Sequence, residues 1–337
     1  MASTSSRIHS ELDLQRDGRQ TGFLRIPHSV HRSAYGWLPM PAVCIRNGDG
    51  PRVLIMAGNH GDEYEGQVAL CKLARGLESA QVHGRVLLLP MANYPAARAG
   101  RRTSPIDGGN LNRTFPGDPD GTVTQMIAHF IEEVVMPECD LMIDIPSGGS
   151  SLDYLPSAQA EFEPEGGLAP RLRTLVEAFA APVTQVYTPG GEDRMSEAAA
   201  RRKGLTYFGT ELGGAGTVSP AALEAAEHGI ARALVAFGVL RELPPGVPAA
   251  PATRYLEVRG GEHYVYASED GVYEPLVSLG DEVTAGQPAA ALHFPHTPWR
   301  EPVIEHFAAG GVVICRRTFA HSERGDCLFH LGADWSA

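Results

Sequence analysis

A histidine and a glutamate, two residue types that bind zinc, lie three residues apart directly after a short apolar segment. Residues 53–56 have the continuous apolar pattern of a strand covered on both faces, and residues 57–59 end it. His60 and Glu63 follow on a glycine-containing turn that leads into a predicted helix. An imidazole and a carboxylate at this spacing also occur by chance on polar loops. At the carboxyl end of a parallel strand, however, the pair is typical of a catalytic zinc site.

Three later residues add chemistry that complements this pair. The predicted strand LTYFGTEL ends at Glu211, so this carboxylate emerges where His60 does. A carboxylate beside a metal is the expected general base for activating water. Asn112 and Arg113 lie in a long irregular segment, 93–117, which we interpret as an ordered loop near the site. They form a candidate clamp for a carboxylate, because a planar guanidinium binds one bidentately. A structural salt bridge of Arg113 is the alternative.

Alternating strands and helices are expected to position these residues. Residues 63–80 have the apolar spacing of an amphipathic helix, and residues 85–89 repeat the buried-strand pattern. A strand, a helix and a strand with short connections favour an α/β sheet. The alternation continues through predicted strands at 139–145 and 183–187 and through predicted helices at 122–135, 171–179, 196–202 and 221–237. Before the motif, short strand-like pieces in 21–46 predict an antiparallel edge.

The chain length and a proline-rich segment indicate two domains. At 337 residues the chain exceeds the usual size of one domain, and LPPGVPAAPAT marks a change in composition. We expect a catalytic domain over 1–245, with 1–46 as its lead-in, and a smaller all-β domain over 246–337. The stretch GVYEPLVSLGDEVTAGQPAAALHF resembles the hammerhead of lipoyl and biotinyl domains, but its hairpin lacks the lysine to which the cofactor attaches. It is therefore expected to be a structural lid or interface element.

Composition excludes several function classes. A net charge of -12 without a long basic block argues against a nucleic-acid partner. The polar N-terminus and the absence of a long apolar run predict a cytoplasmic protein that does not enter membranes. Five widely spaced cysteines without a C-x-x-C pair make a disulfide framework unexpected. The sequence is compatible with a homo-oligomer.

With these pieces in place, the chain resembles the succinylglutamate desuccinylase and aspartoacylase family, relatives of the zinc carboxypeptidases, over most of its length. The motifs that carry the resemblance are GNHGDEYEG at 58–66, SPIDGGNLNRTFPG at 104–117, DIPSGG at 144–149 and TELGG at 210–214, in the family's order. Their wording is most similar to the branch that contains N-acetyl-diaminobutyrate deacetylases of ectoine breakdown. The implied fold is a zinc-carboxypeptidase-like mixed sheet flanked by helices.

The resemblance also implies a role for each matching residue. His60 and Glu63 would bind zinc, one ion per chain, and Glu211 would serve as general base. Asn112 and Arg113 would hold the substrate carboxylate. Arg102 would polarise the scissile carbonyl. The implied activity is hydrolysis of the amide bond of a small N-acyl amino acid.

One departure from the family pattern concerns the metal. The family motif D-L-H-S-G-G supplies the third zinc ligand through its histidine, whereas Pro146 stands at that position here and has no donor atom. Three alternatives follow. Asp144, two residues earlier on the same strand face, replaces the ligand; or zinc is held weakly by His60, Glu63 and water; or the site holds no metal, and the protein binds an acyl-amino acid without hydrolysis. A carboxypeptidase that acts on peptides is a further alternative.

Overall fold

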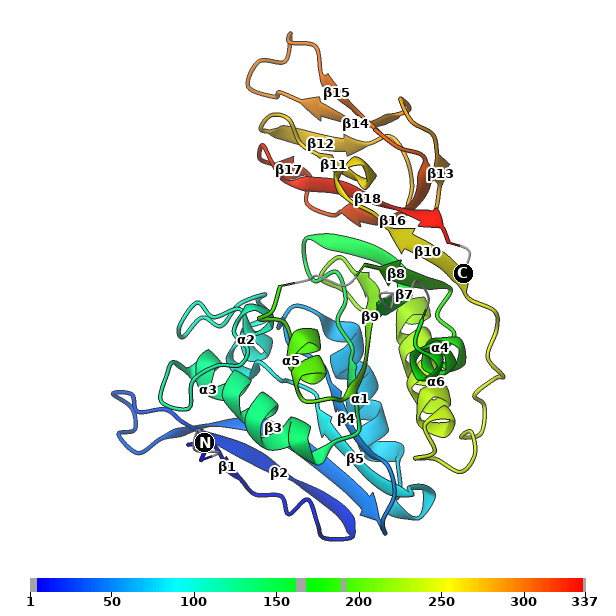
Figure 1. Cartoon of the computed structure of the whole chain (residues 1–337). Helices are drawn as coiled ribbons and strands as arrows, with labels where there is room; N and C mark the ends of the chain where they lie inside the picture. The colour runs from blue at the N-terminus through cyan, green and yellow to red at the C-terminus, as the bar shows by residue number, and fades with distance from the viewer. Residues whose placement is uncertain (1–4, 162–167, 189–191, 336–337) are drawn as a thin grey trace.

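A large mixed sheet with helices on both faces dominates the structure, a computed structural model that describes residues 5–161, 168–188 and 192–335 (Figure 1). In hydrogen-bonding order the sheet runs through β1 (His9–Ser10), β2 (Gly18–Pro27), β3 (Trp37–Asn47), β5 (Gly84–Leu89), β4 (Arg52–Met56), β6 (Leu141–Asp144), β9 (Thr206–Gly214), β7 (Leu152–Glu161), β8 (Val183–Tyr187), β10 (Arg254–Val258), β18 (Cys327–Asp334), β16 (Gly311–Arg317) and β13 (Glu282–Val283), with β11 (Tyr264–Tyr266) paired to β18.

A second, four-stranded sheet lies in the C-terminal part of the chain. Its strands, in order, are β15 (Val303–His306), β14 (Pro288–His293), β12 (Gly271–Pro275) and β17 (His321–Ser322). The α-helices are α1 (Tyr64–Gly76), α2 (Tyr94–Ala99), α3 (Val123–His129), α4 (Pro170–Phe179), α5 (Ser196–Arg202) and α6 (Pro220–Ala236). Short helical turns of other types are η1 (Ser79–Gln81), η2 (Leu111–Arg113), η3 (Phe130–Val135), η4 (Met136–Glu138) and η5 (Gly261–His263). Within the described ranges no helix is both long and apolar enough to span a bilayer.

The centre of the main sheet is parallel and buried, as the apolar segments predicted. Strand β4 hydrogen-bonds in parallel to β5 on one side and to β6 on the other. Every residue of β5 and β6 is buried, and so are four of the five residues of β4. A parallel strand covered on both faces requires this composition, because neither face meets water.

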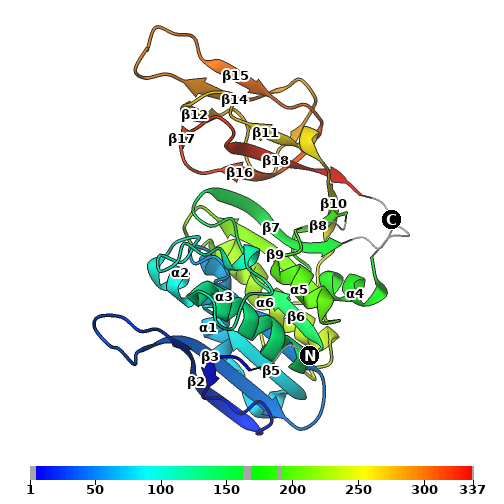
Figure 2. The same cartoon turned by 60° about the vertical axis from the view of Figure 1, so that its left-hand side comes forward.

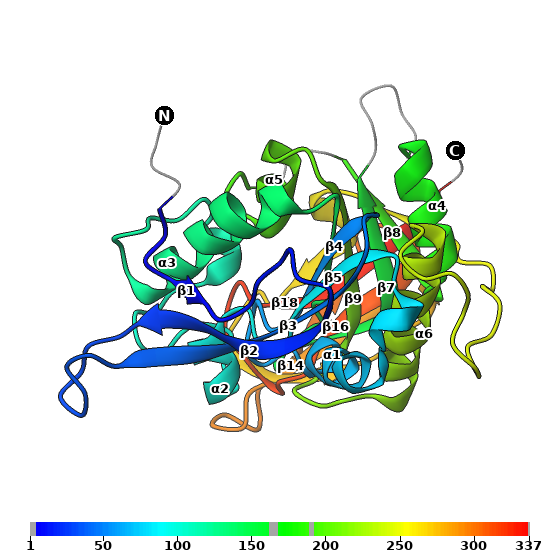
Figure 3. The same ribbon diagram turned by 90° about the horizontal axis from the view of Figure 1, so that it is seen from below.

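Two helical layers cover the faces of the sheet. Side chains alternate along a strand, so Val53 and Ile55 of β4 pack in one cluster with α1, α4 and α6, while Leu54 and Met56 pack in the other with α3 and α5. Figure 3, viewed from below, shows the strands between these layers. The prediction of an α/β fold is confirmed.

Two predicted segments carry more structure than expected. The irregular stretch 93–117 opens with helix α2, whose Pro95 lies in the first turn, where a missing N–H costs nothing, and Gly100 (φ 60°) ends it. In the N-terminal lead-in, Ile8 and Leu12 are buried against the β2–β3 edge, so this part of the chain is packed on the sheet. The antiparallel edge itself is confirmed, since β2 and β3 pair along their whole length.

The C-terminal strands stand away from the helical layers (Figure 2). They have an apolar core of their own, in which Phe307 and Phe329 are fully buried. They are also joined to the main sheet, because β10 pairs in parallel with β8 and β16 pairs with β7. A division of the chain into 1–245 and 246–337 remains our proposal.

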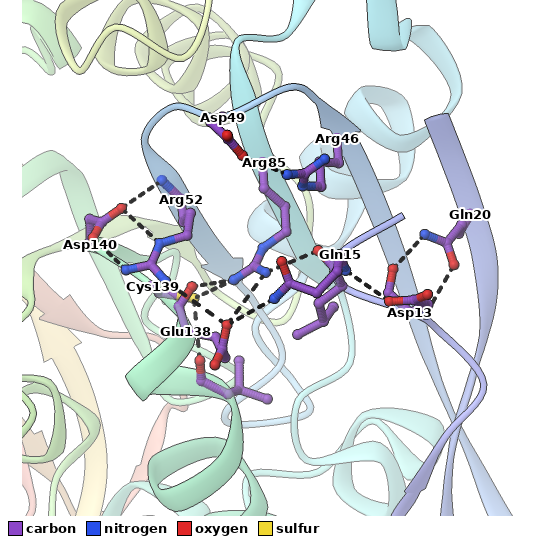
Figure 4. A network of polar contacts seen from close by, with 12 residues as sticks. Asp13, Gln15, Gln20, Arg46, Asp49, Arg52, Arg85, Glu138, Cys139 and Asp140 are labelled. Atoms are coloured by element: carbon purple, nitrogen blue, oxygen red, sulfur yellow. Dashed lines mark hydrogen bonds and ion pairs between the residues drawn. The ribbon is translucent and has the colours of Figure 1, made fainter. Parts of the chain in front are cut away.

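A polar network ties together the amino ends of the central strands (Figure 4). The Arg52 side chain at the start of β4 donates to both carboxylate oxygens of Asp140, which precedes β6, at 3.2 and 2.9 Å. Its backbone N–H donates to the same carboxylate at 2.9 Å. Arg85 of β5 donates to the carbonyls of Leu14 and Glu138. This network fixes the strand ends remote from His60 and Glu63.

Asp140→Asn is expected to lower the free energy of unfolding by about 1 kcal/mol at pH 7, because the Arg52–Asp140 pair is partly exposed. The hydrogen bonds from Arg52 hold the pKa of Asp140 below its ordinary value. Its stabilisation is therefore present above the unfolded-state pKa of about 4 and is lost as the pH falls through the lower folded-state pKa. Urea unfolding at pH 7 and pH 3 tests this, with the fully exposed Asp49→Asn as control. An equal difference at both pH values contradicts it.

Candidate active site

The turn after β4 is held rigidly, and this fixes where His60 and Glu63 lie. Gly58 has a φ of 69°, a left-handed conformation that favours glycine. A side chain at Gly61 would lie 2.0 Å from the backbone of Ala96 in α2, so only glycine permits this close packing. The Gly61 N–H also donates to the carbonyl of Arg101 at 2.8 Å. Helix α1 begins immediately after Glu63.

His60 and Glu63 are buried and face each other. Nδ1 of His60 lies 2.7 Å from Oε1 of Glu63, and its Nε2 lies 3.0 Å from Oδ1 of Asn110. A guanidinium nitrogen of Arg102 lies 3.4 Å from the same Nδ1 and 3.8 Å from Glu63. The imidazole, the carboxylate and the arginine thus form one cluster.

Asp144 at the end of β6 is anchored through one oxygen only. Its Oδ2 accepts from Nδ2 of Asn59 at 3.2 Å and from Oγ of Ser196 at 3.0 Å, whereas the buried Oδ1 has no partner within the described structure. Burial raises the pKa of Asp144 to about 6. Pro146 lies two residues further on. Within the described ranges no three His, Cys, Asp or Glu side chains are grouped to hold a metal ion.

Glu211 lies in the middle of β9 rather than at a strand end. Strand β9 pairs in parallel with β6 through Phe208 and then continues to Gly214 by pairing antiparallel with β7, where Glu211 lies opposite Ser157. This change of partner carries Glu211 past the end of β6. Burial, followed by the negative charge of Glu63, raises the pKa of Glu211 well above its ordinary value. Its buried Oε2 has no partner among the described residues.

One cavity of about 180 Å³ brings the predicted site residues together. Its lining includes the three acidic residues, the histidine, both arginines and the asparagine that the sequence indicated: His60, Glu63, Arg102, Asn112, Arg113, Asp144 and Glu211. Such a pocket combines a candidate general base, a candidate metal pair and cationic donors. This combination suits hydrolysis of a small anionic substrate.

Comparison with known proteins agrees with this chemistry. The model of the succinylglutamate desuccinylase/aspartoacylase catalytic domain matches residues 49–237. The chain belongs to this family. An N-alpha-acetyl-L-2,4-diaminobutyric acid deacetylase of Halomonas elongata is 40% identical over 96% of this chain and 94% of its own.

Solved structures extend the likeness over the whole fold. The product-bound ectoine utilization protein EutE (DoeB) from Ruegeria pomeroyi is 36% identical, with a TM-score of 0.93 over 98% of this chain and 99% of that one. A succinylglutamate desuccinylase/aspartoacylase from Rhodobacter sphaeroides is 37% identical, with a TM-score of 0.91 over 98% of this chain and all of that one. The likeness to solved members of the family therefore covers nearly the whole chain, including the C-terminal strands.

The two residues of the predicted carboxylate clamp already have partners within this family member. Oδ1 of Asn112 accepts from the backbone N–H of Ser196 at 2.9 Å and so positions the start of α5. Nε of Arg113 lies 2.7 Å from a carboxylate oxygen of Glu192, an exposed pair, and Nη1 donates to the carbonyl of Asn112. A bound carboxylate would compete with Glu192 for the guanidinium.

Among the polar residues of this desuccinylase/aspartoacylase-type site that sequence reasoning missed, four stand out. Asn110 contacts His60, and Tyr154, Tyr207 and Glu197 line the cavity. Asn110 lies within the motif at 104–117, so its place in the motif was an available signal. The other three come from β7, β9 and α5 and reach the cavity only through tertiary packing.

Proposed function

We propose that this chain hydrolyses the amide bond of a small N-acyl amino acid, with N-alpha-acetyl-L-2,4-diaminobutyrate or a close analogue as substrate. The observation that carries the proposal is the single cavity in which Glu211, His60, Glu63 and Arg102 meet. The full-length similarity to a deacetylase of this substrate supports it. The products are a free amino acid and a carboxylic acid.

We further propose zinc as the cofactor, one ion per chain. His60 and Glu63 would hold it, and Asp144 is the proposed replacement for the ligand lost at Pro146. The buried oxygens of Asp144 and Glu211 without partners fit a nearby cation, because an uncompensated buried carboxylate is costly. When bound, zinc supplies Lewis-acid polarisation of the carbonyl and lowers the pKa of water.

The chain's own residues are proposed to carry the proton and position the substrate. Glu211, whose raised pKa favours proton uptake, accepts a proton from the attacking water and returns it to the leaving nitrogen. Arg102 donates to the carbonyl oxygen, where negative charge develops. Asn112 and Arg113 bind the substrate carboxylate. The proton that Glu211 takes from water thus ends on the amino group of the amino-acid product.

Acetate release from N-alpha-acetyl-L-2,4-diaminobutyrate, followed by proton NMR, tests the proposal. Purified protein with added zinc is expected to release one acetate per amino acid formed, and a chelator is expected to stop the reaction. If no acetate is released either with or without zinc, the proposed function is wrong.

A second candidate function is binding without hydrolysis. Pro146 in place of a ligand and the direct contact between His60 and Glu63 are the observations that favour it. A binding protein would show a higher melting temperature with the acyl-amino acid but no acetate release.

Arg113→Gln is expected to raise KM about 10–100-fold with a smaller change in kcat, because hydrogen bonds from a charged donor to the substrate carboxylate are lost. Initial rates over a range of substrate concentrations measure both constants. The control is Arg98→Gln, since Arg98 is exposed and lies outside the cavity. A large fall in kcat at unchanged KM would instead assign Arg113 to the reaction itself.

A further inference from the structure

One acidic side chain of the cavity has no task in the proposed hydrolysis. Helix α5 lies beside β9 (Figure 1). Glu197 is in its first turn and lines the same cavity as Glu211 and Arg113. Its side chain is half-buried, and Oε1 accepts a hydrogen bond from the hydroxyl of Tyr187 at 2.9 Å. Tyr187 ends β8, so two elements hold this carboxylate in place.

The charge of Glu197 has no cationic partner of its own. Among the described residues no lysine or arginine forms an ion pair with it, because the nearby Arg201 pairs with Glu161 at 2.9 and 3.1 Å. Burial, followed by the charge of Glu161, raises the pKa of Glu197 to about 8. A half-buried carboxylate with a raised pKa gains from a counter-ion. A cationic ligand bound in the cavity would supply this counter-ion.

The cavity adjoins a second one at Glu197. Gln159, Glu197 and Tyr207 line both this cavity and a neighbouring one of about 350 Å³. Glu197 therefore stands where the two spaces meet. A ligand that extends beyond the reacting amide would reach this carboxylate.

A further feature, the Asp144 oxygen proposed above to face zinc, indicates that the cavity holds a polar or charged group. Asp144, which lines the cavity, is 2% exposed, and its Oδ1 has no partner among the described residues. Buried polar atoms ordinarily have a partner, so such an atom marks a place for a bound group. Arginines and carboxylates line the same space, which suits a ligand that carries both charges.

We infer that Glu197 binds the side-chain ammonium of the substrate and makes the enzyme selective for N-acyl amino acids with a short cationic side chain. This inference rests on the proposed function and adds its determinant of specificity. In N-alpha-acetyl-2,4-diaminobutyrate the free amine lies two carbons from the carbon that bears the carboxylate and the amide. Arg113 and Glu197 thus meet the two charged ends of one molecule.

Glu197→Gln tests the inference with a pair of substrates. N-alpha-acetyl-norvaline has a methyl group where the diaminobutyrate derivative has its ammonium, so it lacks the charge at similar size. The wild type is expected to prefer the cationic substrate. In Glu197→Gln its kcat/KM is expected to fall about 10–100-fold, mainly through KM, with little change for the norvaline derivative. Asp193→Asn, an exposed acid four residues earlier, removes the same charge outside the cavity as a control.

The outcomes separate this inference from the proposed function. Equal losses on both substrates, or a wild type without preference, would overturn the role of Glu197 while hydrolysis stands. If the wild type hydrolyses neither substrate, the proposed function fails, and a binding measurement then tests the role of Glu197. Free 2,4-diaminobutyrate should raise the melting temperature of the wild type more than norvaline does. It should not raise the melting temperature of Glu197→Gln. If Glu197→Gln does not fold, Glu197→Asp keeps the charge and should keep the preference.

Discussion

Glu211→Gln is expected to reduce kcat for acetate release about 10²–10⁴-fold, the typical contribution of a positioned general base. The amide has the size of the carboxylate but cannot take a proton from water. Because burial raises the pKa of Glu211 above its unfolded value, its ionisation destabilises the folded state at neutral pH. The variant should therefore melt at the same temperature or higher, which separates lost chemistry from lost folding.

The control for this variant is Glu224→Gln on α6, whose side chain is 70% exposed. It removes one carboxylate from the molecule and should leave both kcat and the melting temperature unchanged. Full activity in Glu211→Gln would remove Glu211 from the mechanism and assign proton transfer to another cavity group.

Pro146→His is expected to increase both zinc retention and turnover. Catalytic zinc ordinarily has three protein ligands, and this substitution adds an imidazole on the wall that already holds His60 and Glu63. Residues that merely orient ligands change metal affinity by about 10–100-fold, so a direct ligand should change it by at least that factor. Zinc per chain after dialysis against a competing chelator, together with acetate release, measures the gain.

Pro146→Ala is the matched control for this gain. It removes the proline ring without adding a donor atom, so zinc retention should stay at the level of the unmodified chain. An equal increase in zinc retention in both variants, relative to the unmodified chain, would show that the ring, rather than the missing donor, limits metal binding. No increase in either variant would contradict the prediction. An increase in zinc without an increase in rate would separate the metal from turnover.

The sequence was sufficient to predict the structure wherever a local pattern of residues determines it. The apolar run before His60 predicted a buried parallel strand, and the family motifs selected side chains that line one cavity. These signals are short-range, because strand burial and turn chemistry depend on neighbouring residues.

Sequence reasoning failed where distant segments determine the environment. The position of Glu211 in mid-strand follows from the change of partner in β9, which no local pattern records. Glu197 looked like any acidic residue in a first helical turn. The exposed pairing of Arg113 with Glu192 likewise depends on the path of a loop. Such relations belong to the folded chain as a whole.

Pairing between β7 and β16 sets the order in which the protein can mature. Tyr154 lines the cavity and lies opposite Cys315 of β16, which follows it far along the sequence. During synthesis on the ribosome, β7 therefore lacks one neighbour until β16 has emerged. A truncated product that ends before β16 would contain every proposed catalytic side chain and still have an unfinished pocket. Activity should consequently appear only after β16 has been synthesised and has paired with β7.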